Sequence, residues 1–156
     1  MSGSASDAPP VHAAEATPPS TVYIESSALV AAVLEQDIPL DAVLGGALRR
    51  VTSALTLAEV YRAVLRARIA NRVTDAQEQY AIQSLGIFEE RCTIINITDA
   101  VLERARRPFP IEPVRTLDAI HLASAELMEG PPQFVTVLTR DARVRDNARA
   151  LGHPVI

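Results

Sequence analysis

Short apolar runs alternate with longer helix-like runs along this chain from residue 21 to its end. Strands are predicted over residues 21–24, 51–55, 92–97 and 134–138. Strands separated by helices pair in parallel, because each helix carries the chain back across the sheet before the next strand begins. The alternation therefore predicts a three-layer α/β/α sandwich with a central parallel sheet of four or five strands. Residues 154–156 are the candidate for the fifth strand.

Apolar spacing and capping residues place the helices between these strands. Leu57, Val60 and Val64 follow the spacing of an amphipathic helix. Thr56 and Glu59 match a capping box, in which the two residues satisfy backbone N–H groups at the start of a helix. This helix is therefore expected to begin at Thr56. Further helices are expected over residues 28–34, 40–50, 74–88 (capped by Thr74), 98–107, 116–128 and 141–151.

The chain of 156 residues has the length of one ordinary domain. Residues 1–20 are rich in Ala, Ser and Pro and show no apolar periodicity, so a disordered leader is expected there. Residues 21–156 are expected to form the folded domain. No run approaches the ~20 apolar residues of a membrane helix, and the single cysteine suits a reducing compartment. These features predict a cytoplasmic protein with no membrane partner.

All 15 basic residues are Arg, and the chain has no Lys. Contacts to phosphate must then come from Arg, which binds phosphate bidentately. The net charge of -4 does not exclude a nucleic-acid partner, because a local basic strip matters more than the sum. The missing Lys excludes a phosphate-accepting receiver domain. The missing Gly-rich turn and Gly-x-Ser-x-Gly motif exclude a dinucleotide-binding domain and a serine hydrolase.

Four carboxylates fall close to the ends of the predicted strands. Glu25 directly follows the first strand, and Asp141 follows the fourth. Glu59 lies near the start of the helix after the second strand, and Asp118 lies in the first turn of the helix before the fourth. In parallel α/β folds, ligands bind where the carboxyl ends of the strands meet. The four carboxylates are therefore expected to gather on one rim of the sheet.

Clustered carboxylates repel one another and stay ionised only if a cation neutralises them. Mg²⁺ and Mn²⁺ prefer oxygen ligands, and such ions activate water and stabilise charge on a phosphoryl group. The cluster therefore predicts a Mg²⁺ (or Mn²⁺) cofactor. Glu59 and Asp141 each have a structural alternative, as residues that cap a helix or offset its dipole.

Four segments around these carboxylates carry recognisable motifs: residues 22–29 (VYIESSAL), 53–60 (SALTLAEV), 115–125 (RTLDAIHLASA) and 138–141 (LTRD). These segments resemble the PIN-domain family, in particular its VapC-like toxins. The third segment is the most specific. Order and spacing agree with the family over residues 21–156, so the resemblance also implies the PIN-like α/β/α fold.

The resemblance implies an endoribonuclease, the toxin of a type II toxin–antitoxin pair, that hydrolyses RNA with metal-activated water. It assigns the metal-binding and catalytic roles to four carboxylates, those of Glu25, Glu59, Asp118 and Asp141. It gives the hydroxyls of Ser27 and Thr139 supporting roles. Asp146 is a weaker addition, for which a solvated charge is the favoured interpretation. The resemblance also implies a homodimer and a cognate antitoxin whose tail enters the site.

Glu25 departs from the family pattern, which has Asp at this position. The extra methylene moves the carboxylate in a site where misplacement by ~1 Å can be costly. A second hypothesis therefore stands beside the ribonuclease: a PIN-like module that binds RNA or protein and whose site is weakened at Glu25. His121 lies three residues after Asp118, on the same side of the helix. It is expected to be a packed, hydrogen-bonded histidine rather than a general base or a ligand.

Overall fold

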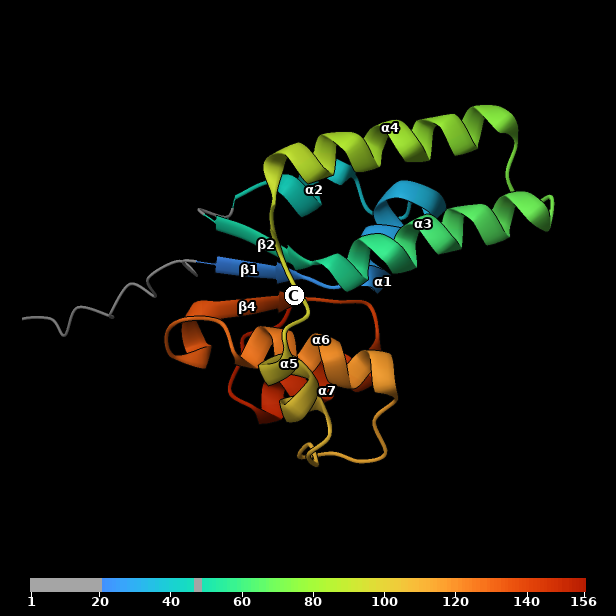
Figure 1. Cartoon of the computed structure of the whole chain (residues 1–156). Coiled ribbons are helices and arrows are strands. Elements are labelled where there is room, and N and C mark those ends of the chain that lie inside the picture. Colours follow the sequence, from blue (N-terminus) through green and yellow to red (C-terminus); the bar gives the residue numbers. More distant parts are fainter. Residues whose placement is uncertain (1–20, 47–48) are drawn as a thin grey trace, which may run out of the picture.

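A computed structural model describes residues 21–46 and 49–156, so the expected leader lies outside the described residues. Four strands form one parallel sheet in the order β3-β2-β1-β4 (Figure 1). The strands are β1 Thr21–Ile24, β2 Arg49–Ser53, β3 Thr93–Ile95 and β4 Val135–Leu138. Val155 adds one isolated parallel bridge to Val137, so the candidate fifth strand contributes a single bridge. The prediction of a parallel sheet is confirmed.

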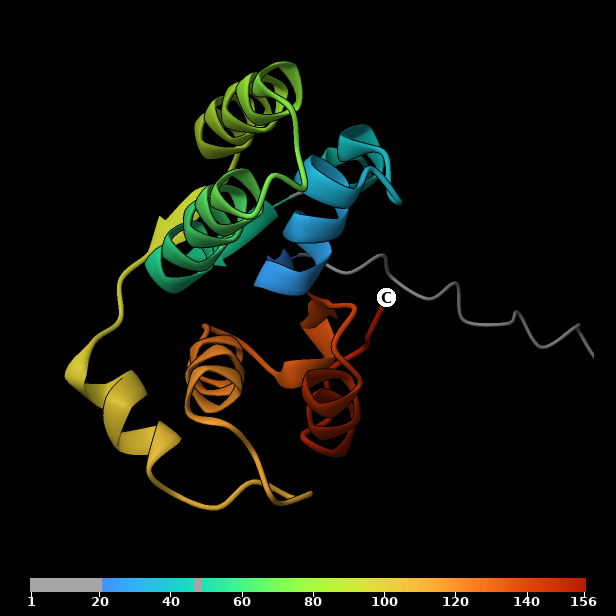
Figure 2. The same cartoon turned by 90° about the vertical axis from the view of Figure 1, so that its right-hand side faces the viewer.

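Helices cover both faces of this sheet, as two views at right angles show (Figures 1 and 2). One face carries α1 Ser26–Val30 with its π-helical continuation Ala31–Glu35, α2 Leu40–Leu44, α3 Ala54–Ile69 and α4 Asp75–Arg91. The other face carries α5 Asp99–Ala105, α6 Thr116–Glu126 and α7 Ala142–Ala150. The predicted three-layer sandwich is therefore confirmed. Among the described helices, none combines the length and the apolarity needed to cross a membrane.

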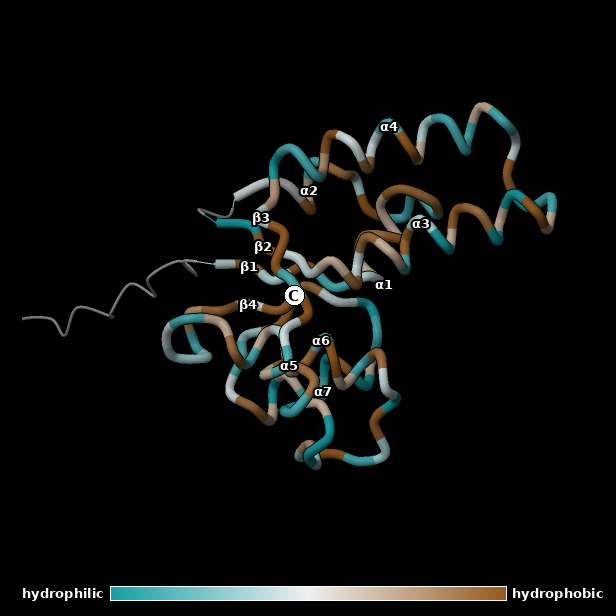
Figure 3. The backbone as a smooth tube through the Cα atoms, viewed as in Figure 1, coloured by the Kyte–Doolittle hydropathy of each residue, from teal (hydrophilic) through white to brown (hydrophobic). Residues whose placement is uncertain are grey.

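The central strand β1 supplies side chains to both cores. Val22 and Ile24 belong to an apolar cluster with residues of α3 and α4, whereas Tyr23 belongs to a cluster with residues of α6 and α7. Successive strand residues point to opposite faces of a sheet, so a strand buried on both faces is an unbroken buried run. Figure 3 shows hydrophobic residues within the strands, a hydrophilic start of β2, and hydrophobic and hydrophilic residues alternating along α3 and α4.

Helix α3 begins two residues earlier than its predicted start at Thr56. Ser53 is the cap, and its hydroxyl accepts a hydrogen bond from the Thr56 N–H at 3.3 Å. The predicted capping box of Thr56 and Glu59 is therefore wrong, and Glu59 is free to contact another helix. The prediction that Thr74 caps the next helix is confirmed, and there Gln77 completes a capping box.

The helix predicted over residues 40–50 is also wrong in its second half. Helix α2 ends at Leu44, and Gly46 has a φ of 70°. Glycine adopts this left-handed conformation at no steric cost and weakens a helix by about 1 kcal/mol relative to Ala. Arg49 already pairs with Thr21 as the first residue of β2. Arg49 and Arg50, which the apolar spacing assigned to a helix, are therefore strand residues paired with β1.

The loop between α5 and α6 leads to the helix that carries Asp118. Asn147 of α7 is fully buried and holds this loop. Its Oδ1 accepts a hydrogen bond from the Ile111 N–H at 2.9 Å, and its Nδ2 donates to the Ile111 carbonyl at 2.9 Å. One side-chain amide therefore satisfies both backbone groups of a loop residue, which buried backbone requires.

We expect Asn147→Ala to lower the free energy of unfolding by about 2 kcal/mol, because each buried group left without a partner costs about 1–3 kcal/mol. Urea unfolding followed by circular dichroism measures the change. Asn96→Ala is the control, because Asn96 is exposed and its loss is expected to change stability by less than about 0.5 kcal/mol. Equal stability of the two variants would contradict the anchoring role of Asn147.

Candidate metal centre

Glu25 lies at the carboxyl end of β1, where it caps α1. Its backbone N–H donates to the carbonyl of Leu138, the last residue of β4, at 3.0 Å. This bond fixes Glu25 at the same edge of the sheet at which β4 ends. The residue is only 4% exposed, so its carboxylate depends on protein groups for hydrogen bonds.

Four donors from three residues surround the Glu25 carboxylate. Ser26 Oγ donates to Oε1 at 2.6 Å, and Thr139 Oγ1 donates to Oε2 at 2.7 Å. The backbone N–H of Ser27 donates to Oε2 at 3.0 Å, and its hydroxyl donates to the same oxygen. The two hydroxyl residues expected to support the site, Ser27 and Thr139, therefore both contact Glu25.

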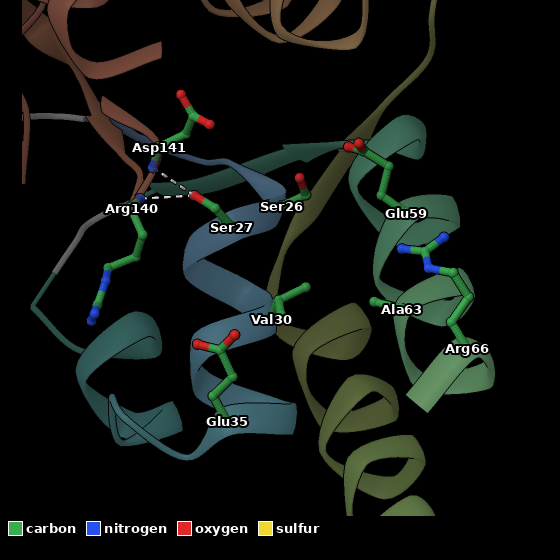
Figure 4. A pocket seen from close by; sticks show the side chains of 9 residues that line it. All are labelled: Ser26, Ser27, Val30, Glu35, Glu59, Ala63, Arg66, Arg140 and Asp141. Atoms are coloured by element: carbon green, nitrogen blue, oxygen red, sulfur yellow. Dashed lines mark hydrogen bonds between the residues drawn. The ribbon is translucent and has the colours of Figure 1, made fainter. Parts of the chain in front are cut away.

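The Ser27 hydroxyl also ties α1 to the turn after β4. It accepts hydrogen bonds from the backbone N–H groups of Arg140 at 2.8 Å and Asp141 at 3.1 Å, drawn as dashed lines in Figure 4. Asp141 in turn caps α7, since its Oδ1 accepts from the N–H groups of Arg143 at 2.7 Å and Val144 at 3.1 Å. Asp141 thus has the capping role that its sequence position allowed, and its backbone is tied to the Glu25 cluster.

Glu59 of α3 meets His121 of α6 across the edge of the sheet. Nε2 of His121 lies 2.6 Å from Oε2 of Glu59 and 3.7 Å from Oε1 of Glu25. Partial burial alone would raise the pKa of Glu59, but the hydrogen bonds from His121 and Ser26 and the positive charges of His121 and Arg66 together outweigh it, and the pKa lies below its usual value. His121 is 1% exposed. His121 is therefore packed and hydrogen-bonded as predicted, whereas the expectation that it is no metal ligand stays a prediction.

Asp118 lies in the first turn of α6 and is half-buried. Burial raises the pKa of its carboxyl group, and the neighbouring charge of Asp141 raises it further. Nη1 of Arg143, 3.5 Å from Oδ2 of Asp118, acts in the opposite direction. The two aspartates are therefore close enough to interact, and Arg143 partly balances their charge.

The described residues contain one group of side chains able to hold a metal ion together: Glu25, Glu59 and His121, with ligand atoms within 4.8 Å of one another. Asp118 and Asp141 are not members of that group. Asp146 is exposed on α7, and its Oδ1 lies 3.4 Å from Nε of Arg145. The four predicted carboxylates thus form two neighbouring pairs, and His121 joins the first pair. The carboxylate oxygens of Glu25 and Glu59 suit Mg²⁺ or Mn²⁺, whereas imidazole is a more usual ligand of zinc, copper or iron.

A groove of about 360 Å³ opens beside this cluster. Figure 4 shows Glu59 and Arg66 of α3 on one side of the groove, and Arg140 and Asp141 on the other. Arg62 and Arg66 also line a smaller adjoining hollow of about 260 Å³ with Glu59. The groove therefore combines carboxylates that can attract a cation with guanidinium groups that can bind phosphate.

Sequence reasoning missed one member of this centre, Tyr23 of β1. Its hydroxyl lies 2.9 Å from Nδ1 of His121. The sequence signal was a phenol within a short apolar strand that is expected to be buried, because a buried Tyr hydroxyl usually has a hydrogen-bond partner. The sequence could not name that partner, which lies 98 residues further along the chain.

Comparisons with known proteins agree with this architecture. The model of the PIN domain family matches residues 22–150. Ribonuclease VapC35 of Mycobacterium tuberculosis is 32% identical over 140 residues, which cover 86% of this chain and 95% of the relative. Ribonuclease VapC46 of the same organism is 35% identical over 143 residues, with the same coverage of both chains.

Solved structures show the same fold. VapBC-5 from Mycobacterium tuberculosis, a member of the VapBC family of toxin-antitoxin systems, has a TM-score of 0.55 at 22% identity, over 88% of this chain and 97% of that chain. VapC20 of the same organism, described as a Sarcin-Ricin loop cleaving toxin, has a TM-score of 0.58 at 13% identity, over 85% and 95% of the two chains.

Proposed function

Because the chain belongs to the PIN-domain family, we propose that it is a metal-dependent endoribonuclease and the toxin of a type II toxin–antitoxin pair. One observation carries the proposal: Glu25, Glu59 and His121 converge within 4.8 Å at the carboxyl edge of the sheet, beside an Arg-lined groove. The relatives named as ribonucleases support RNA as the substrate. We also propose that it acts in the cytoplasm, a reducing compartment that suits its single cysteine.

The proposed mechanism assigns each part of the centre a task. Glu25 and Glu59 would hold the ion, and Asp118 and Asp141 would orient the attacking water. Bound Mg²⁺ or Mn²⁺ would lower the pKa of that water and neutralise charge on the phosphoryl group. Asp118 is the proposed acceptor of the proton of the water, because its half-buried carboxylate lies outside the group of Glu25, Glu59 and His121.

The groove supplies the contacts that hold RNA. Arg66 and Arg140 approach it from opposite sides, and each guanidinium can bind a backbone phosphate through two hydrogen bonds. These contacts are independent of base identity, so they position the strand without selecting a sequence. The fixed carboxylates then meet the scissile phosphate at one end of the groove.

The proposed partners are a cognate antitoxin and a second copy of this chain. VapBC2 from Rickettsia felis, solved with a DNA fragment from its promoter, has a TM-score of 0.53 at 15% identity, over 87% of this chain and 97% of that chain. VapBC-5 is named as a member of a family of toxin-antitoxin systems, which supports an antitoxin partner. We assign residues 21–156 to the nuclease domain and residues 1–20 to a leader outside it.

The rival hypothesis of a weakened RNA- or protein-binding module depended on Glu25. Ser26, Ser27 and Thr139 place four donors around its carboxylate. A side chain that met no partner would indicate a site that no longer fits its residue. The surroundings of Glu25 instead fit the longer side chain, which supports a working nuclease.

We expect the purified chain to cleave RNA in the presence of Mn²⁺ or Mg²⁺, and EDTA to reduce cleavage to background, because the carboxylates need a cation to bind a phosphate. A gel assay with a labelled RNA measures the cleavage, and added Mn²⁺ should restore it. Cleavage that persists in EDTA would contradict metal dependence. RNA binding without cleavage under either ion would favour the non-catalytic module.

A further inference from the structure

A buried polar chain runs from the middle of the sheet to the candidate metal centre. The Tyr23 hydroxyl lies 2.9 Å from Nδ1 of His121, and Nε2 of the same ring lies 2.6 Å from Oε2 of Glu59. Tyr23 is 0% exposed and His121 is 1% exposed. The three residues come from β1, α6 and α3, so the chain connects both helical layers through the central strand.

The hydrogen bonds among Tyr23, His121 and Glu59 have one consistent set of donors and acceptors. A carboxylate that holds a cation is ionised and can only accept a hydrogen bond, so Nε2–H of His121 donates to Oε2 of Glu59. In the neutral ring, Nδ1 then carries the lone pair and accepts from the Tyr23 hydroxyl. All three groups are satisfied, as a buried polar network requires.

The position of the Glu59 side chain depends on the hydrogen bonds of Tyr23 and His121, whereas that of Glu25 does not. Glu25 is held by Ser26 and Ser27, its neighbours in sequence, and by Thr139. Glu59 is half-buried and reaches toward the groove, and its 2.6 Å bond comes from a residue 62 positions away. An unrestrained glutamate on a helix samples several rotamers. The fixed imidazole therefore selects the rotamer that brings Glu59 toward Glu25.

We propose that Tyr23 and His121 are positioning residues: Tyr23 orients the imidazole, and the imidazole holds the Glu59 carboxylate where it binds the metal ion. This inference rests on the proposed function. A fully buried phenol and imidazole cost desolvation that apolar side chains would avoid, which a role in packing alone does not explain. Hydrogen-bond partners of metal ligands typically change metal affinity or activity 10-fold to 100-fold when removed.

The first test is Tyr23→Phe, which removes one oxygen and keeps the buried ring. We expect the Kd for Mn²⁺, measured by isothermal titration calorimetry, to rise about 10-fold to 100-fold. We also expect kcat to fall by a similar factor while KM for RNA stays unchanged, because the groove contacts remain. Tyr61→Phe is the matched control, since its hydroxyl donates to Glu89 on the exposed side of the α3–α4 pair.

The second test separates the two ends of the imidazole. His121→Gln keeps a donor near the position of Nε2 and is expected to stay within about 10-fold of wild type in Mn²⁺ affinity. His121→Asn keeps a polar group near the position of Nδ1 but is too short to reach Glu59, so it should lose affinity as Tyr23→Phe does. Thermal unfolding of both variants shows that the fold persists.

Two results would overturn the positioning role. One is wild-type Mn²⁺ affinity in both Tyr23→Phe and His121→Asn with a lowered melting temperature, which would make the chain purely structural. The other is ¹⁴N hyperfine coupling from an imidazole in the pulsed EPR spectrum of the Mn²⁺-loaded wild type, which would make His121 a ligand. Failure of the proposed function differs: wild type would then neither bind Mn²⁺ nor cleave RNA, and the positioning role would fall with it.

Discussion

We expect Asp118→Asn to reduce RNA cleavage about a thousandfold. Asparagine has nearly the same shape but cannot accept the proton of the attacking water and brings no negative charge to the ion. Losing several kcal/mol of transition-state stabilisation corresponds to about a thousandfold in rate. Single-turnover cleavage of a labelled RNA with Mn²⁺ measures the effect. The control is Asp99→Asn, because Asp99 also lies in the first turn of a helix but on α5, where it belongs to neither pair of carboxylates.

The same variant is expected to unfold at an equal or higher temperature than wild type at neutral pH. Burial and the charge of Asp141 raise the pKa of Asp118 in the folded state. The folded state therefore holds this proton more tightly than the unfolded state, and stability falls as pH rises through the raised pKa. Asn removes this penalty, which is fully present above that pKa. The advantage of Asp118→Asn should thus shrink on acidification, as thermal unfolding across pH can measure.

This pairing of lost activity with retained stability distinguishes a functional carboxylate from a structural one. A carboxylate that only offsets a helix dipole stabilises its helix by about 0.3–1 kcal/mol, so its removal would lower stability and leave cleavage intact. Equal cleavage by wild type and Asp118→Asn would therefore remove Asp118 from the reaction and with it the proposed mechanism.

Local patterns were enough to predict most of the fold. The bounds of β1, the Thr74 cap and the alternation of strands with helices follow from side chains close in sequence. The prediction of a capping box at Thr56 failed because Ser53 and Thr56 are both suitable N-cap residues for this helix. Ser53 and Thr56 each have a polar residue three positions further on, and the choice depends on where β2 ends. The end of β2 is set by its pairing with β1, which is a tertiary contact and cannot be predicted from neighbouring residues.

The candidate site could be predicted only in part, for the same reason. The strand ends located the edge at which the carboxylates lie, because parallel strands share one carboxyl edge. The division into two pairs, with His121 joining Glu25 and Glu59, depends on how α3 and α6 approach each other. Tyr23 and His121 are 98 residues apart, so their contact has no local pattern. The assignment of catalytic roles to the four carboxylates stays a prediction.

The surroundings of Glu25 bear on whether a glutamate in place of the aspartate typical of the family weakens the site. Its carboxylate reaches Ser26 Oγ at 2.6 Å and Thr139 Oγ1 at 2.7 Å, and it lies 3.7 Å from Nε2 of His121. These partners come from α1, from the end of β4 and from α6. An aspartate at the same backbone position would stop about one C–C bond short of them. The partners therefore fit the side chain that this chain has, rather than the one typical of the family.

We expect Glu25→Asp to lower cleavage about 100-fold, because a carboxylate misplaced by ~1 Å in a reactive site can cost that factor. The shorter side chain also leaves a buried space of one methylene, worth about 0.8 kcal/mol of stability. The cleavage assay and urea unfolding measure the two effects. Glu90→Asp makes the same shortening at an exposed position and should change neither. A rise in cleavage on Glu25→Asp would contradict this expectation. The native glutamate would then limit the activity of the site, and that result would favour the hypothesis of a weakened binding module.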